Sequence, residues 1–87
     1  MREVFYEDDV SQQIDAAAKQ FPRIHDAIAG LEWRLGHRPK EAVARGPIFY
    51  IFRQKGFKNL NIPDITVVYR YEGEQIHIFG IKITPAE

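Results

Sequence analysis

The segment ITVVYRYEGEQIHIFGIKI, residues 65–83, limits the possible folds more than any other part of the chain. Two runs rich in β-branched and aromatic residues stand on either side of a polar EGEQ stretch, which is followed by Ile76 and contains Gly73. This arrangement predicts an antiparallel β-hairpin, because strand-forming runs joined by a short glycine-containing turn pair with each other. The chain is therefore expected to contain a sheet, with other elements packed against it.

Two amphipathic helices are predicted before this hairpin. In residues 8–21, DDVSQQIDAAAKQF, apolar side chains recur at helical spacing. In residues 22–36, PRIHDAIAGLEWRLG, one narrow apolar stripe at about 100° per residue is formed by Ile24, Ile28, Leu31 and Leu35. Phe21 ends the first helix, because the residue before Pro22 avoids helical dihedrals. The two segments are therefore expected to form a helical hairpin.

The remaining segments complete the predicted fold. REVFY at residues 2–6 and GPIFYIFRQ at residues 46–54 are short, aromatic and β-branched, which is typical of strands. The predicted order is an N-terminal strand, the helical hairpin and then a three-stranded antiparallel meander. We therefore expect a single α+β domain over residues 1–87, with the helices packed on one face of a small, mainly antiparallel sheet.

Composition excludes several classes of protein. The chain has 87 residues and no cysteine, so neither a disulfide framework nor a thiolate zinc site is possible. No apolar run reaches the roughly 18 residues of a membrane span, and MREVFYEDD does not look like a signal peptide. The histidines lack metal-ligand spacing, and no phosphate-binding loop or dinucleotide fingerprint is present. We expect a cytoplasmic protein with no metal, no cofactor and no membrane partner.

The net charge of zero hides a strong segregation of charge along the sequence. Residues 1–33 carry seven acids and three cations, whereas residues 34–58 carry seven cations and one acid. A basic middle of this kind is typical of proteins that bind an anionic partner. The alternative, that the cations only keep this surface solvated, stays open.

The stretch FRQKGFKNL, residues 52–60, interleaves cations with two phenylalanines. Mixtures of this kind bind phosphates and bases, although an ordinary charged loop between strands has the same composition. Two further cations lie on the strands of the predicted hairpin. The candidates for contact with a nucleic acid or another target are Arg53, Lys55, Lys58, Arg70 and Lys82.

Strand alternation predicts which side chains share a face of the sheet. Thr66, Val68 and Arg70 are expected on one face of their strand. On the last strand, His77 and Lys82 are expected on opposite faces, so that they do not converge. A lone histidine among aliphatic neighbours is more typical of a structural residue than of an acid–base catalyst.

Trp33 lies nine residues after Ile24, about 180° from the apolar stripe at helical spacing, where a helix facing solvent is not expected to carry tryptophan. One interpretation is contact with the neighbouring helix or with the Arg38-Pro39 loop. The other is an interface with a partner or a second copy, since tryptophan often anchors interfaces.

In the order and length of these elements, the chain resembles the RelE/ParE superfamily of bacterial toxins. The likeness rests on ITVVYRY at residues 65–71, EGEQ at 72–75 and IHIFGIKI at 76–83. These segments are similar to the family's penultimate strand, its acidic or glycine turn and its apolar last strand. GLEWRLGHRPKEAVARG at 30–46 lies where the family has the end of its second helix, a proline loop and a small residue before the sheet.

The resemblance implies a growth-inhibiting toxin of a type II toxin–antitoxin pair, neutralised by a cognate antitoxin. The RelE-like branch cuts messenger RNA in the ribosome, and the ParE-like branch poisons DNA gyrase. In ribosome-dependent relatives, cations near residues 53–58 grip RNA phosphate, which favours an RNA-binding interpretation of the basic middle. Trp33 becomes a candidate for contact with the antitoxin or for self-association.

Two positions depart from the pattern of the family's nucleases. Thr66 stands, in an alignment on Tyr69, where those enzymes usually carry an arginine, and the tail TPAE lacks their histidine–tyrosine or arginine–tyrosine segment. Threonine can neither activate a 2′-hydroxyl nor stabilise the charge of a phosphorane-like transition state. The catalytic residues are therefore unassigned. The alternative function is a non-enzymatic RelE-like interaction module without toxicity.

Overall fold

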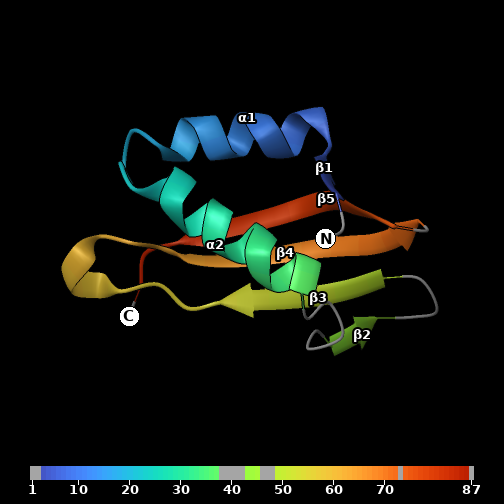
Figure 1. Ribbon diagram of the computed structural model, residues 1–87. Coiled ribbons are helices and arrows are strands. Elements are labelled where there is room, and N and C mark those ends of the chain that lie inside the picture. Colours follow the sequence, from blue (N-terminus) through green and yellow to red (C-terminus); the bar gives the residue numbers. More distant parts are fainter. Residues whose placement is uncertain (1–2, 38–42, 46–48, 73, 87) are drawn as a thin grey trace.

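The computed structural model describes residues 3–37, 43–45, 49–72 and 74–86 (Figure 1). In chain order the elements are β1 (Glu3–Tyr6), α1 (Asp8–Ala17), α2 (Ile24–His37), β2 (Val43–Arg45), β3 (Phe49–Gln54), the short 3-10 helix η2 (Lys58–Leu60), β4 (Asp64–Glu72) and β5 (Gln75–Thr84). Helix α1 ends at Ala17 rather than at the predicted Phe21, because the chain turns at residues 18–20 and so brings the buried Phe21 into the core.

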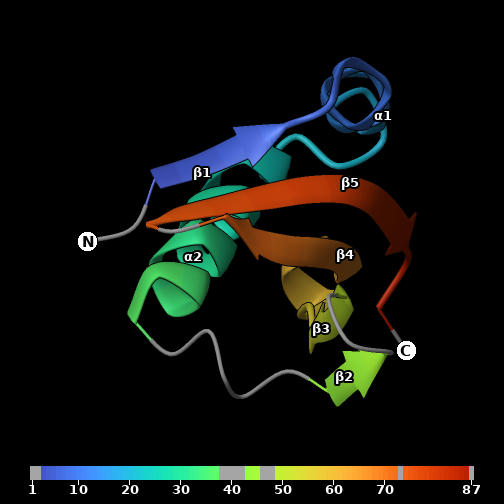
Figure 2. The ribbon, with the colours of Figure 1, turned by 90° about the vertical axis from the view of Figure 1, so that its right-hand side faces the viewer.

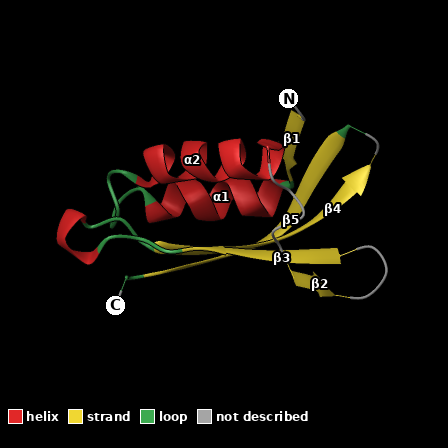
Figure 3. Ribbon diagram, turned by 60° about the horizontal axis from the view of Figure 1, so that its bottom comes forward, coloured by secondary structure: helices red, strands yellow, loops and turns green. Residues whose placement is uncertain are grey.

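The strands form one five-stranded sheet in the order β1-β5-β4-β3-β2, which Figure 2 shows from top to bottom. Strand β1 runs parallel to β5, and the other neighbouring pairs are antiparallel. Both helices cover the same face of this sheet (Figure 3). The predicted α+β class, with both helices on one face, is therefore confirmed.

The predicted three-stranded meander does not match the sheet in full, because two edge strands extend it. Residues Val43–Arg45 add β2 beside β3, and β1 makes the sheet mixed through its parallel pairing. Strand β2 is three residues long, which is too short for an alternating pattern to reveal it. The long chain between β1 and β5 provides the crossover that parallel pairing requires.

The core lies between α2 and the central strands. The predicted apolar stripe of α2 is buried, together with Val10 and Ile14 of α1. It packs against alternate residues of the sheet, and the largest buried side chains there are Ile65, Val67, Tyr69, Ile76 and Ile78. Each buried aliphatic side chain contributes about 1.5–3 kcal/mol, so this layer holds both helices to one face and leaves the other face without a described helix.

A register shift in β5 changes which side chains reach that uncovered face. Tyr69 pairs with Ile78 but Val68 pairs with Gly80, so Phe79 is an extra residue of the kind found in a β-bulge. His77 then pairs with Arg70, and Lys82 pairs with Thr66. All four lie on the same face, so the expectation that His77 and Lys82 lie on opposite faces is wrong.

The connection between β3 and β4 is held by backbone bonds. Phe57 and Ile62 exchange two N–H···O bonds of 2.9 and 3.1 Å, and Asn61 has a positive φ of 54°. The Asn61 side chain donates to the backbone oxygen of Gln20 at 3.1 Å, which joins this connection to the turn between the helices. Gly56 is required here, since a Cβ at this position would lie 2.0 Å from the Ile62 carbonyl oxygen.

Alanine at two glycines is expected to change stability in opposite directions. Gly56→Ala should lower the free energy of unfolding by about 1–3 kcal/mol, because the added methyl meets backbone. Gly30→Ala should raise it by about 0.5–1 kcal/mol, because Gly30 lies inside α2 and a Cβ there meets nothing within 4 Å. Urea unfolding of both variants beside the wild-type protein measures these changes, and equal shifts of the same sign would contradict both assignments.

Candidate functional site

A concavity of about 730 Å³ lies on the uncovered face, at the end of the sheet next to the β3–β4 connection. We call it the basic concavity. It is lined by Arg53, Lys58, Asp64, Thr66, Lys82, Thr84, Pro85 and Ala86. Arg53, Thr66 and Lys82 form one row of the sheet register, across β3, β4 and β5. Pairing of three strands therefore brings together cations that are far apart in the sequence.

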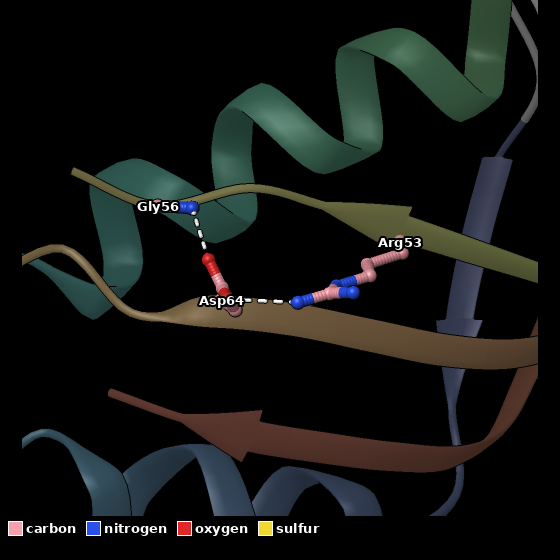
Figure 4. Close-up of polar contacts among 3 residues, drawn as sticks. All are labelled: Arg53, Gly56 and Asp64. Atoms are coloured by element: carbon pink, nitrogen blue, oxygen red, sulfur yellow. Dashed lines mark hydrogen bonds and ion pairs between the residues drawn. The ribbon is translucent and has the colours of Figure 1, made fainter. Parts of the chain in front are cut away.

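The carboxylate of Asp64, the first residue of β4, holds this region together (Figure 4). Its Oδ1 atom accepts the backbone N–H of Gly56 at 2.7 Å, and its Oδ2 atom accepts from Nη2 of Arg53 at 3.1 Å. The Asp64 side chain is 8% exposed, whereas that of Arg53 is 60% exposed. Asp64 thus fixes one edge of the guanidinium while leaving most of the Arg53 side chain open to solvent.

Asp64 is held in its ionised form. The Gly56 N–H bond lowers the pKa of the Asp64 carboxyl most, and the hydrogen bond from Arg53 lowers it further. An ionised carboxylate beside three cations leaves the basic concavity with a net positive charge. Lys58 and Lys82 make no ion pair with any acid in the part of the chain that the structure describes.

The composition of the basic concavity suits it to bind an anion. Two ammonium groups, part of a guanidinium and the hydroxyls of Thr66 and Thr84 can all donate hydrogen bonds to phosphate oxygens. Among its described lining residues there is no histidine, and the lowered pKa of Asp64 keeps that carboxyl ionised, so Asp64 is not suited to act as a general acid. Within the described ranges, no group of three or more His, Asp or Glu side chains is placed to hold a metal ion.

The structure brings three of the five predicted contact residues together and leaves two apart. Arg53, Lys58 and Lys82 line the basic concavity. Lys55 lines a different hollow, beside α2. Arg70 lies on the same face of β4 as Thr66, but four residues further along, which is about 13 Å in a strand.

Arg70 is also compensated by an acid. Its Nη2 atom lies 2.6 Å from Oε1 of Glu72, and the other carboxylate oxygen of Glu72 lies 3.2 Å from Nε2 of His77. The His77 ring stacks on Phe5, with the ring centroids 5.3 Å apart. Because the Glu72 carboxylate compensates the Arg70 guanidinium, this cluster attracts an anion much less than the basic concavity does.

Trp33 lies outside the buried stripe, as its helical spacing predicts, and its side chain is 55% exposed. Its ring stacks on His37 with centroids 4.1 Å apart, and the His37 Nδ1 atom donates to the Trp33 backbone oxygen at 2.8 Å. The Arg38-Pro39 loop, which was the alternative contact for Trp33, lies outside the described residues.

Asp64 is the residue that sequence reasoning missed. Its partners Gly56 and Arg53 are 8 and 11 positions away, so no helical or strand period connects them. The available signal was an acid directly after Pro63, just before the strand-forming run ITVVY and a few residues after a run of cations. A buried acid in that setting usually has a cationic partner.

The pH dependence of stability should reveal the Asp64 bonds. A carboxyl whose pKa is lowered by folding stabilises the protein above its unfolded pKa, and this stabilisation is lost as the pH falls below about 5. Asp64→Asn should therefore be less stable at neutral pH and should lose less on acidification than the wild-type protein. Urea midpoints between about pH 7 and pH 3 measure this.

Asp15→Asn is the control for that measurement, because Asp15 is exposed on α1 and makes no ion pair with a described residue. It should follow the wild-type curve. A wild-type curve that is as flat as that of Asp64→Asn would show that the Asp64 bonds add no stability.

Comparison with known proteins identifies no relative of this chain. No protein-family model matches the chain, and neither the curated proteins nor the solved structures contain a significant match. The described part of the chain has no helix long and apolar enough to cross a membrane. The most prominent feature of the described residues is therefore the positively charged concavity on the uncovered face of the sheet.

Proposed function

We propose that this protein is a cytoplasmic, growth-inhibiting toxin of a type II toxin–antitoxin pair, with a RelE/ParE-like fold and a cognate antitoxin. Its basic concavity binds the phosphates of messenger RNA at the ribosome. The observation that carries the proposal is the row of Arg53, Thr66 and Lys82 with Lys58 beside it, on the face that the helices leave open.

The order of elements supports this proposal. A first strand, two helices and the antiparallel run β3-β4-β5 follow one another as in the RelE/ParE-like arrangement that the sequence resembles. Both helices lie behind the sheet, so a ligand can approach the other face (Figure 3). Cations there attract a phosphate backbone whatever its sequence, which suits a protein that acts on many messages.

The basic concavity is assigned to binding, and no residue in it is assigned to catalysis. Thr66 stands between Arg53 and Lys82 where the family's nucleases usually carry an arginine, and no histidine is among the described residues that line the concavity with it. This favours a second candidate function, an RNA-binding or protein-binding module of the same fold that does not cleave RNA and is not toxic. An assay also has to distinguish poisoning of DNA gyrase from cleavage of messenger RNA.

Expression in a bacterial host tests the proposal. We expect growth arrest with cleaved messenger RNA and without accumulation of DNA breaks. Lys58→Ala and Lys82→Ala should each relieve the arrest, because each removes a cation that no described acid compensates. Arg53→Ala is a poorer test, because it also leaves the buried Asp64 carboxylate without its ion-pair partner.

Binding of the purified protein to single-stranded RNA gives an independent measurement. Each lysine substitution should reduce the slope of log affinity against log salt by about 0.7. Lys19→Ala is the matched control, since Lys19 is exposed in the turn between the helices and does not line the basic concavity. Growth arrest that Lys58→Ala and Lys82→Ala leave unchanged would sink the assignment of this site, and no arrest at all would favour the non-toxic module.

A further inference from the structure

A second hollow, of about 390 Å³, lies on the helix-covered side of the molecule, between α2 and the β3–β4 connection. We call it the α2 groove. It is lined by Asp26, Ala27, Gly30, Arg34, Gln54, Lys55, Phe57 and Ile62. Its two walls are fixed to each other, because Nε2 of Gln54 donates to the Ala27 backbone oxygen at 2.9 Å. The groove is therefore preformed rather than opened by a ligand.

No packing contact within the described residues requires a glycine at position 30. It lies in the interior of α2, where glycine is among the least favourable residues for a helix. A Cβ at Gly30 meets nothing within 4 Å, so no neighbouring element needs the missing side chain. The missing side chain leaves open space on this face of α2, where a group from outside the described chain can approach the helix closely.

The rim of the α2 groove combines positive charge with exposed aromatic surface. Arg34 and Lys55 make no ion pair with a described acid, whereas Asp26 has Arg23 at 3.8 Å. The Phe57 side chain is 60% exposed. Trp33 is 55% exposed and follows Gly30 by three positions, so the two are neighbours on the surface of α2. Aromatic residues and arginine are the types that anchor protein interfaces.

We propose that the α2 groove docks an acidic peptide segment of a partner protein. An apolar side chain of that segment packs over Gly30 against Phe57, and its carboxylates face Arg34 and Lys55. The charge of the rim selects an acidic partner, and the size of the hollow suits one or two side chains rather than a folded surface. This inference goes beyond the proposed RNA contact, because the two sites lie on different sides of the sheet and share no lining residue.

The only tryptophan of the chain, Trp33, does not line the groove but lies one helical turn from Gly30, which makes it the natural fluorescent reporter. The probe is a synthetic peptide in which Asp and Glu flank a Leu-Phe pair, with a second peptide carrying Lys at every acidic position. The acidic peptide should change the fluorescence of Trp33 in a saturable manner, and the basic peptide should not. Arg34→Glu and Lys55→Glu should each weaken binding about tenfold or more. Lys19→Glu, the same charge change away from the groove, should leave it unchanged.

Substitution of Gly30 separates docking from folding. Gly30→Leu places a side chain in the groove, yet leucine favours a helix and its Cβ meets nothing, so the variant should be at least as heat-stable as the wild-type protein. It should nevertheless bind the acidic peptide about tenfold more weakly or worse. Gly30→Ala, which adds only a methyl group, should stabilise the helix and reduce binding less.

Several results would overturn the inference. These are no saturable signal from the wild-type protein, equal binding of the basic peptide, or wild-type affinity in a stable Gly30→Leu variant. A wild-type dimer that Gly30→Leu converts to a monomer would make the groove a contact between copies of this chain instead. The RNA proposal is tested independently of the groove. Lys82→Ala should relieve growth arrest while leaving peptide binding intact, because Lys82 does not line the α2 groove.

Discussion

The packing of α2 on the central strands is the constraint on which the other features depend. Its apolar stripe is buried in one cluster with the alternate residues of β4 and β5 that point to the same side and with Phe52 of β3, so both helices gather on one face. The opposite face is then free to carry polar and charged side chains. No described helix covers that face, which leaves it accessible to a ligand.

The Asp64 carboxylate organises the basic concavity, as the apolar stripe of α2 organises the fold. It accepts one hydrogen bond from backbone and one from a guanidinium, so it fixes the start of β4, the backbone at Gly56 and the direction of Arg53 together. A carboxylate in a region proposed to bind phosphate looks unfavourable in a count of charges. Here it orders one cation and leaves Lys58 and Lys82 without an ion pair to any described acid, so the attraction for an anion is retained.

Most of the fold could be predicted, because it follows from local periods. The stripe of α2, the exposed position of Trp33 and the pairing of β4 with β5 each depend on spacing within one or two neighbouring segments. Strand β2 could not be predicted from three residues, and β1 gave no sign of which neighbour it would choose. The site was harder. The cations Arg53, Lys58 and Lys82 were recognised by type, but their convergence with Asp64 depends on register across three strands.

The error over His77 shows the limit of alternation as a rule. A period of two holds only while every residue is paired, and a single extra residue at Phe79 reverses the sides for the rest of the strand. As a result Ile81 and Ile83 turn toward the core, where they pack against its buried residues, and Lys82 turns toward the uncovered face. The bulge therefore places a cation in the basic concavity that a regular strand would have pointed at the helices.

The short connection between β3 and β4 contributes lining residues to both hollows, so the two binding sites share a segment of backbone. Lys55 and Phe57 contribute to the α2 groove, while Lys58, the very next residue, contributes to the basic concavity. Because both hollows include residues of this one segment, occupation of one can change the affinity of the other. If binding at one site changes the affinity of the other by some factor, binding at the second site changes the affinity of the first by the same factor, because linkage between two binding equilibria is reciprocal. If the two sites are coupled, the partner proposed for the α2 groove would act as an effector of anion binding without touching the anion.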